Sequence, residues 1–368
     1  MKRPPVIGLA LSGGGSRAIA FHLGCLRALN DRALLSQISV LSAVSGGSVI
    51  AGLYAYRDQS FESFDERVVE LLRRGLHRDI LKSLFCPALA TRILASNLIA
   101  RPVAFFSNLL RRQPPLRRWA SRSDALECVL KSYYGDLQIR EVVRQDLDVI
   151  INACELRTGT AFRFGNRCSG SWRTGRIVGN RIDLAHAVAC SAAYPIFLPA
   201  FDRYYDFEKG AVSERRRVII TDGGVFDNLG TTCIEPGRDS AYSLHAYEPD
   251  YLICCSAGYG QLAGDTIPYS LLSRTTAAFE AVFRKAQDAT VKRLHLLRSS
   301  GRLQGFILPF LGQQDNALPV RPPDLITREE VLDYPTNFAA MPEGDINRLT
   351  MRGEQLTRLL LKYYTPEL

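Results

Sequence analysis

Histidine is scarce in this sequence, and cysteine lacks the spacing of a metal site. Five histidines are spread over 368 residues, and the nine cysteines include no C-x-x-C pair. A zinc site needs about four such ligands at close spacing, so we expect no structural or catalytic metal. An odd number of scattered cysteines is typical of reduced thiols and indicates the cytoplasm.

Long uninterrupted apolar runs are also missing. Met1–Pro5 is basic, but the apolar run Val6–Leu11 that follows is too short for a signal peptide and is followed closely by three glycines. The most apolar later segment, Leu81–Leu110, is interrupted by charged residues and prolines. These are Lys82, Pro87, Arg92, Arg101 and Pro102. A membrane-crossing helix needs about 20 apolar residues, so we expect none in this chain.

Acidic residues are nearly absent between Arg73 and Arg122. This segment holds eleven Lys or Arg and the single acid Asp79, whereas the whole chain has a formal net charge of +9. Such a basic block points to an anionic surface, either a membrane or a nucleic acid. Zinc, RNP and homeodomain-like signatures are missing, which favours a membrane. The candidate residues for docking on an anionic membrane are Arg101, Arg111, Arg112, Arg117 and Arg118.

The rest of the chain has the pattern of an α/β protein. Hydrophobic residues make up 46% and charged residues 23% of the sequence, which suits a sizeable globular core. Solid apolar runs at 6–11, 37–44, 147–155, 218–221 and 251–256 predict strands, and segments of helical periodicity alternate with them. We therefore expect a mainly parallel central sheet sandwiched by helices in three layers.

A chain of this length accommodates one catalytic unit with appendages. We expect a catalytic domain at residues 1–300, with a basic helical insert at about 61–123. Residues 301–368 then form a C-terminal extension that ends in a helix packed on the core.

A glycine-rich loop joins the first predicted strand to the first helix. Gly13, Gly14 and Gly15 fit G-x-G-x-x-A, but a dinucleotide site needs an acidic residue about 20 positions on, at the end of the second strand. Here the second strand ends in Ser45. No Walker lysine follows the glycines either. Bare backbone amides before a helix suit a developing oxyanion. Arg17 either adds positive charge there or braces the loop.

Ser45 is the candidate nucleophile. It lies in the stretch SAVSGGS, between a strand and a helix, and resembles the centre of a G-x-S-x-G elbow in which Ala43 replaces the first glycine. Ala43 and Gly47 are small enough to let the strand and the helix pack closely. The N–H of Gly46, directly after the nucleophile, is the natural second oxyanion donor.

Asp222 is the candidate general base. It ends the apolar strand VIITD and precedes Gly223, which we expect to support the site together with Arg17 and Gly47. The carboxyl ends of parallel strands meet at one edge of a sheet, so Asp222 and Ser45 are expected there together. A Ser-Asp-His triad with His245 or His295 is an alternative, although His245 lies in a polar stretch that suggests a solvated side chain.

Together, SGGGSRA (12–18), SAVSGGS (42–48) and TDGGVFDNLG (221–230) resemble the patatin-like phospholipases in order and spacing. AVACSAAYPIFLPA (187–200) is similar to the Ala-Ser-rich helix and proline turn of that family. The resemblance covers roughly residues 6–229 without the basic insert. Ala18 and Ala43 stand where the family pattern has glycine.

This resemblance implies a Ser45–Asp222 dyad in which the aspartate takes the serine proton directly. It also implies that Gly13, Gly14 and Gly15 form the oxyanion loop, that no cofactor is needed, and that the substrate is a phospholipid or lysophospholipid. We therefore predict a cytoplasmic serine esterase with peripheral contact to an anionic membrane. An inactive lipid-binding or scaffold module of the same fold is the alternative from another class.

Overall fold

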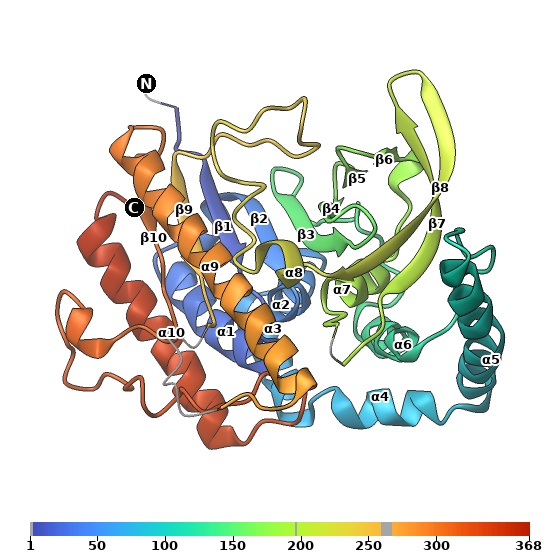
Figure 1. Ribbon diagram of the computed structural model, residues 1–368. Helices are drawn as coiled ribbons and strands as arrows, with labels where there is room; N and C mark the ends of the chain where they lie inside the picture. The colour runs from blue at the N-terminus through green and yellow to red at the C-terminus, as the bar shows by residue number, and fades with distance from the viewer. Residues whose placement is uncertain (1–2, 196, 259–266) are drawn as a thin grey trace.

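A ten-stranded mixed sheet lies at the centre of the protein (Figure 1). The computed structural model describes residues 3–195, 197–258 and 267–368. The strands are β1 (Ile7–Leu11), β2 (Ile38–Val44), β3 (Asp148–Glu155), β4 (Thr160–Gly165), β5 (Ser169–Ser171), β6 (Gly175–Ile177), β7 (Phe201–Lys209), β8 (Val212–Asp222), β9 (Tyr251–Cys255) and β10 (Gly305–Ile307). Their order is β10-β9-β1-β2-β3-β4-β5-β6-β7-β8. Pairing is parallel from β10 to β3 and antiparallel from β3 to β8.

Helices cover both faces of the parallel part, which confirms the predicted three-layer α/β fold. One face packs on helices that include α1 (Gly15–Asp31), α2 (Gly46–Ala55), α3 (Phe61–Arg74), α6 (Arg122–Tyr134), α7 (Leu184–Ser191) and α10 (Glu343–Tyr364). The other face packs on α9 (Leu271–Ser299). The short helix α8 (Gly224–Asp227) lies against β3.

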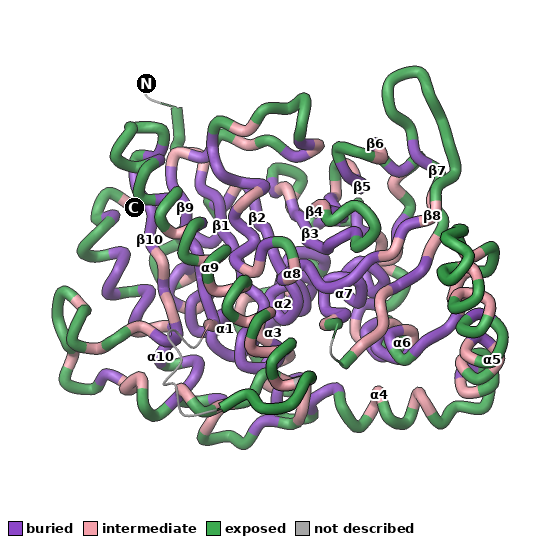
Figure 2. The backbone as a smooth tube through the Cα atoms, viewed as in Figure 1, coloured by how far each residue is buried: buried purple, intermediate pink, exposed green. Residues whose placement is uncertain are grey.

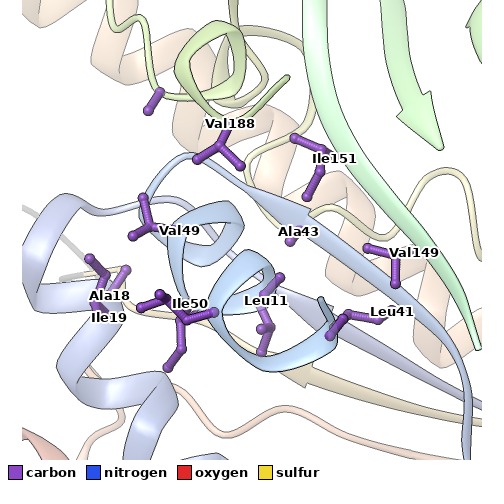
Figure 3. Packing of buried hydrophobic residues seen from close by; sticks show 14 of the residues in the cluster. Leu11, Ala18, Ile19, Leu41, Ala43, Val49, Ile50, Val149, Ile151 and Val188 are labelled. Carbon is purple, nitrogen blue, oxygen red and sulfur yellow. The ribbon is translucent and has the colours of Figure 1, made fainter. Parts of the chain in front are cut away.

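The strands of the parallel part are apolar on both faces because each face has a helical cover. In β1, Leu9 and Leu11 point toward the α1 side, whereas Ala10 belongs to the smaller cluster under α9. Figure 3 shows Leu11, Leu41 and Ile50 in the core cluster around α2. Burial on both faces explains the solid apolar runs seen in the sequence.

The ends of β2 and β8 meet on β3. β2 runs parallel to the first half of β3, up to the pair Val44 and Asn152, and β8 runs antiparallel to the second half, from the pair Asp222 and Ala153. The expectation that Asp222 ends a parallel strand is therefore wrong. Its strand arrives from the opposite direction, and the two carboxyl ends still come together because both strands occupy the same edge of β3.

Two further helices, α4 (His77–Leu84) and α5 (Pro87–Leu109), project from the body between α3 and α6 (Figure 1). Among the described residues, α5 is the one helix long and apolar enough to cross a membrane by length and composition, with 17% of its most apolar stretch buried. The expectation that Pro102 would interrupt this segment is wrong. The helix continues through Pro102, whose missing N–H falls at an exposed position.

Candidate active site

Ser45 forms a strained turn between β2 and α2. Its backbone has φ 51° and ψ −118°, in a region that residues other than glycine rarely adopt, and its side chain is mostly buried. The turn depends on the glycines that follow: a Cβ on Gly46 would overlap the carbonyl oxygen of Gly15, and one on Gly47 would overlap that of Leu11. This is the tight strand-helix geometry that the elbow motif predicts.

Asp222 lies buried at the end of β8. Its Oδ1 accepts a hydrogen bond of 2.7 Å from the N–H of Gly224, and no described residue donates to Oδ2 with good geometry. Burial raises the pKa of Asp222 to about 7, although the Ser45 hydroxyl and the Gly224 amide act in the opposite direction. A carboxylate with this pKa, next to the Ser45 hydroxyl, suits a general base near neutral pH. Gly223 allows the close approach, since a Cβ there would overlap the carbonyl oxygen of Asn152.

The glycine loop supplies backbone donors beside Ser45, but not from all the residues expected. The N–H of Gly13 donates to the carbonyl of Asn228 at 3.1 Å, so it is not free to hold an oxyanion. In the described part of the chain, the amides of Gly14, Gly15 and Gly46 have no acceptor. Gly13 contributes close approach instead, because a Cβ there would lie 3.2 Å from Ser45 Cβ.

The donors belong to two helix N-termini. Gly14 and Gly15 have φ of 147° and 59°, which turns the chain sharply into α1, and Gly46 is the first residue of α2. The two helix starts lie close together, because a Cβ on Gly46 would lie 2.3 Å from the carbonyl oxygen of Gly15. Unpaired N–H groups at two neighbouring helix N-termini are donors of the kind that can bind an anion.

Arg17 braces the site rather than facing the nucleophile. Its Nε donates to the carbonyl of Ala257 at 3.0 Å, and one of its terminal nitrogens donates to the carbonyl of Tyr334 at 3.1 Å. Burial lowers the pKa of Arg17 to about 9. Of the two roles considered for Arg17, the contacts favour tying the α1 start to the segment after β9 and to the C-terminal region.

Two polar residues that the sequence reasoning missed hold the elbow in place. The Ser191 hydroxyl accepts a hydrogen bond from Ser45 N at 2.9 Å and donates to Asn152 O at 2.6 Å, and it also lies 2.8 Å from Ser48 Oγ. The Asn152 side chain donates to Ser42 Oγ at 2.8 Å and to Ala43 O at 3.0 Å. A polar residue inside the buried run 147–155 was the available signal for Asn152.

Neither histidine of the alternative triad contacts the dyad. His245 is buried, contrary to the expectation of a solvated side chain, and its Nε2 lies 3.0 Å from the carbonyl of Cys168. Burial lowers the pKa of His245 to about 3. His295 is exposed on α9, where its ring packs against Phe306.

A groove opens next to Asp222, between α8 and α9. Its lining residues are Gly224, Val225, Phe226, Asp227, Asn228, Phe279, Val282, Phe283, Ala286, Gln287 and Thr290. The ring centroids of Phe279 and Tyr194 are 6.4 Å apart. Burial and the charge of Asp222 raise the pKa of Tyr194, so Tyr194 lies near that carboxylate. The mostly apolar groove and the carboxylate are therefore close neighbours.

The arginines predicted to dock on a membrane fall into two groups by exposure. Arg101, Arg111 and Arg112 are exposed. Arg117 donates to the carbonyl of Asp202 at 3.2 Å, and the N–H of Arg118 donates to the Asp202 carboxylate at 2.8 Å, so both are partly buried against β7. These last two are tied to the protein body and are less suited to an external surface than expected.

Residues 9–232 match the model of the patatin-like phospholipase family, which is more than half of the chain. Among solved structures, human GIVD cytosolic phospholipase A2 aligns with a TM-score of 0.55 at 15% identity, over 97% of this chain and 59% of that chain. The same human enzyme with methyl gamma-linolenyl fluorophosphonate and terbium chloride gives 0.50 at 14%, over 97% and 58%. VipD from Legionella pneumophila gives 0.41 at 15%, over 98% and 67%. Curated proteins include no significant match.

Proposed function

The chain belongs to the patatin-like phospholipase family, and we propose that it hydrolyses acyl esters of phospholipids or lysophospholipids with a Ser45–Asp222 dyad. One observation carries the proposal. The strained Ser45 turn and the buried Asp222 lie at the point where β2 and β8 meet on β3, beside free backbone donors. The human enzyme of similar fold spans a longer chain, of which this protein matches 59%.

In the acylation step, an Asp222 oxygen takes the proton of Ser45 Oγ while Oγ attacks the ester carbonyl carbon. The carbonyl oxygen becomes negatively charged and accepts hydrogen bonds from the amides of Gly14, Gly15 and Gly46. The ester C–O bond then breaks, and Asp222 returns the proton to the departing alcohol oxygen. The product at this stage is an acyl ester on Ser45.

Deacylation reverses these roles with water as the nucleophile. Asp222 takes a proton from water, the resulting hydroxide attacks the acyl carbon, and Ser45 Oγ leaves with that proton. A free fatty acid and the original enzyme result. An aspartate whose pKa is about 7 can both accept and release this proton near neutral pH, so the proposed mechanism uses no histidine.

Two features support a lipid as the substrate. The apolar groove between α8 and α9 starts at Gly224, whose N–H binds Asp222, and its lining suits contact with part of an acyl chain. The basic segment between Arg73 and Arg122 favours peripheral contact with an anionic membrane, and the free cysteines favour the cytoplasm. The proposed enzyme is therefore cytoplasmic and makes peripheral contact with an anionic membrane.

Product analysis tests the function. Defined phospholipids and lysophospholipids are incubated with the wild type and with Ser45→Ala, and fatty acids and remaining lipids are measured by mass spectrometry. Release of fatty acid by the wild type alone supports the proposal. Lipid binding without hydrolysis by either protein would instead favour an inactive lipid-binding module.

A further inference from the structure

Helix α5 lies outside the buried core (Figure 2). Its exposed surface is nevertheless largely apolar. Six of its large apolar side chains are between 49% and 70% exposed: Leu94, Leu98, Ile99, Phe105, Phe106 and Leu109. Its buried residues are Leu89, Ser96 and Ala100. Phe85, at the end of α4, is 81% exposed. An exposed face this apolar is expected to be covered by something other than water.

Positive charge accompanies this apolar face. Arg92 and Arg101 lie on α5, and Arg111 and Arg112 follow it directly; all four are exposed. The acid of this segment, Asp79, pairs with Arg74 and Lys82 and so neutralises none of them. Arginine heads beside apolar side chains can bind lipid phosphates while their neighbours enter the acyl region.

We propose that α5 lies flat in the surface of an anionic phospholipid bilayer, with its apolar side chains among the acyl chains. The inference rests on the proposed function, because a phospholipase must meet its substrate at such a surface. The occupant of this face is therefore the bilayer itself.

The flat orientation follows from how both ends of α5 are fastened. Before it, α4 packs on α6; after it, the Arg217 guanidinium donates to the carbonyls of Pro114 at 2.5 Å and Leu116 at 3.1 Å. A helix of 23 residues is about 34 Å long, enough to cross a hydrocarbon core of about 30 Å. Crossing would place its two ends on opposite sides of the membrane, although both are attached to one folded body.

Charge also argues against a second copy of the chain as the occupant. A symmetric pair of α5 helices would bring Arg92 and Arg101 of both copies into one apolar interface. Helix α5, all of which the structure describes, contains no Asp or Glu that could neutralise these arginines. Burying unpaired like charges is costly, whereas anionic lipid supplies the opposite charge.

Flotation with phosphatidylcholine–phosphatidylglycerol vesicles tests the proposal. We expect Leu98→Ser/Phe105→Ser/Leu109→Ser to bind at least about 100-fold more weakly than wild type, because three large side chains no longer enter the bilayer. The control is Val212→Ser/Leu296→Ser, which removes similarly exposed apolar side chains from the β7–β8 hairpin and from α9. Equal flotation of the α5 variant and the wild type would overturn the proposal, as would a wild-type dimer that the α5 variant dissociates without any change in vesicle binding.

A fluorescence experiment keeps the proposal testable if the triple variant folds poorly. The chain has two tryptophans, so Trp119→Phe/Trp172→Phe gives a background for a single probe at Phe105→Trp. We expect vesicles to shift this probe's emission to the blue and acyl-brominated lipids to quench it. The same probe at Val212→Trp should show neither effect, and an unquenched Phe105→Trp probe would exclude insertion.

Vesicle binding and ester hydrolysis are measured separately, so the docking role of α5 and the proposed function are tested independently. The α5 variant should keep the wild-type rate on a soluble short-chain ester, and Ser45→Ala should float as the wild type does. Hydrolysis of the soluble ester without vesicle binding would refute only the docking role of α5. Vesicle binding without any hydrolysis would refute only the proposed function.

Discussion

The Ser191 hydroxyl accepts a hydrogen bond from the backbone N–H of Ser45 at 2.9 Å, and so connects α7 to the strained turn of the proposed nucleophile. The same hydroxyl donates to Asn152 O, next to the residue that pairs with Asp222. One side chain thus connects α7, the Ser45 turn and β3. In the proposed mechanism Ser191 is a positioning residue, since its hydroxyl binds the backbone N–H of Ser45.

We expect Ser191→Ala to lower kcat by about 10 to 100-fold, because a small displacement of the nucleophile is enough for such a loss. KM for a soluble ester should change little, since Ser191 does not line the groove. Kinetics and thermal melts are compared with those of Ser36→Ala, an exposed serine far from the site. A lower melting temperature with an unchanged kcat would assign Ser191 a purely structural role.

Ser45→Ala should remove both esterase activity and labelling by a fluorophosphonate probe. The turn gives this hydroxyl alone a place beside the free amides and Asp222. Ser42 and Ser48 are the matched controls: both are buried, and their hydroxyls hydrogen-bond elsewhere, to Gly230 O and Ser191 Oγ. Labelling that persists in Ser45→Ala but disappears in Ser48→Ala would relocate the nucleophile.

Asp222→Asn should lower kcat by about 100 to 10,000-fold, since it keeps the shape of the side chain and removes the proposed general base. His295→Ala and His245→Gln should retain activity per folded molecule, because neither ring contacts the dyad. Circular dichroism checks that each variant is folded. A folded but inactive His245→Gln or His295→Ala would revive the triad.

The raised pKa of Asp222 predicts two opposite pH effects. kcat/KM for a soluble ester should increase as pH rises through about 7, because the carboxylate is then deprotonated and can act as a base. Stability should change in the other direction. The folded state prefers protonated Asp222, so this contribution is fully present below the unfolded pKa of 3.8 and is lost as pH rises through about 7.

Asp222→Asn separates these effects. The variant should melt at a higher temperature than wild type above pH 7, where wild type must bury a charge, and the difference should shrink in acid. Melting curves across this pH range measure it. A wild-type pH–rate profile that is flat through about 7, with no gain in stability for Asp222→Asn, would mean that Asp222 titrates at an ordinary pKa.

The sequence predicted the parts of the site that are contiguous in the chain. Ser45, Gly46 and the glycine loop could be placed at strand-helix turns because strand, turn and helix follow one another within a few residues. The antiparallel arrival of β8 was missed, since a strand's apolar run does not reveal its partner's direction. The hydrogen bond from the Gly13 amide to the carbonyl of Asn228 was missed for a similar reason, because Asn228 lies far along the chain and becomes a neighbour only after folding.

The positive charge around α5 should strengthen binding to anionic vesicles. Each basic residue near an anionic membrane contributes about 1 kcal/mol, so Arg101→Gln/Arg111→Gln/Arg112→Gln should weaken vesicle binding by about 100-fold at low salt. The loss should shrink as salt is added, because screening already weakens the wild type.

A matched variant distinguishes local contact from net charge. Arg32, Arg215 and Arg321 are exposed elsewhere on the molecule, so replacing them with Gln changes the net charge equally. We expect this variant to float almost as the wild type does. Arg117→Gln/Arg118→Gln should also have a small effect, since the Arg117 guanidinium and the Arg118 backbone are bonded to Asp202 and both residues are partly buried. If all three variants lost binding to the same degree, long-range attraction rather than contact at α5 would hold the protein on the membrane.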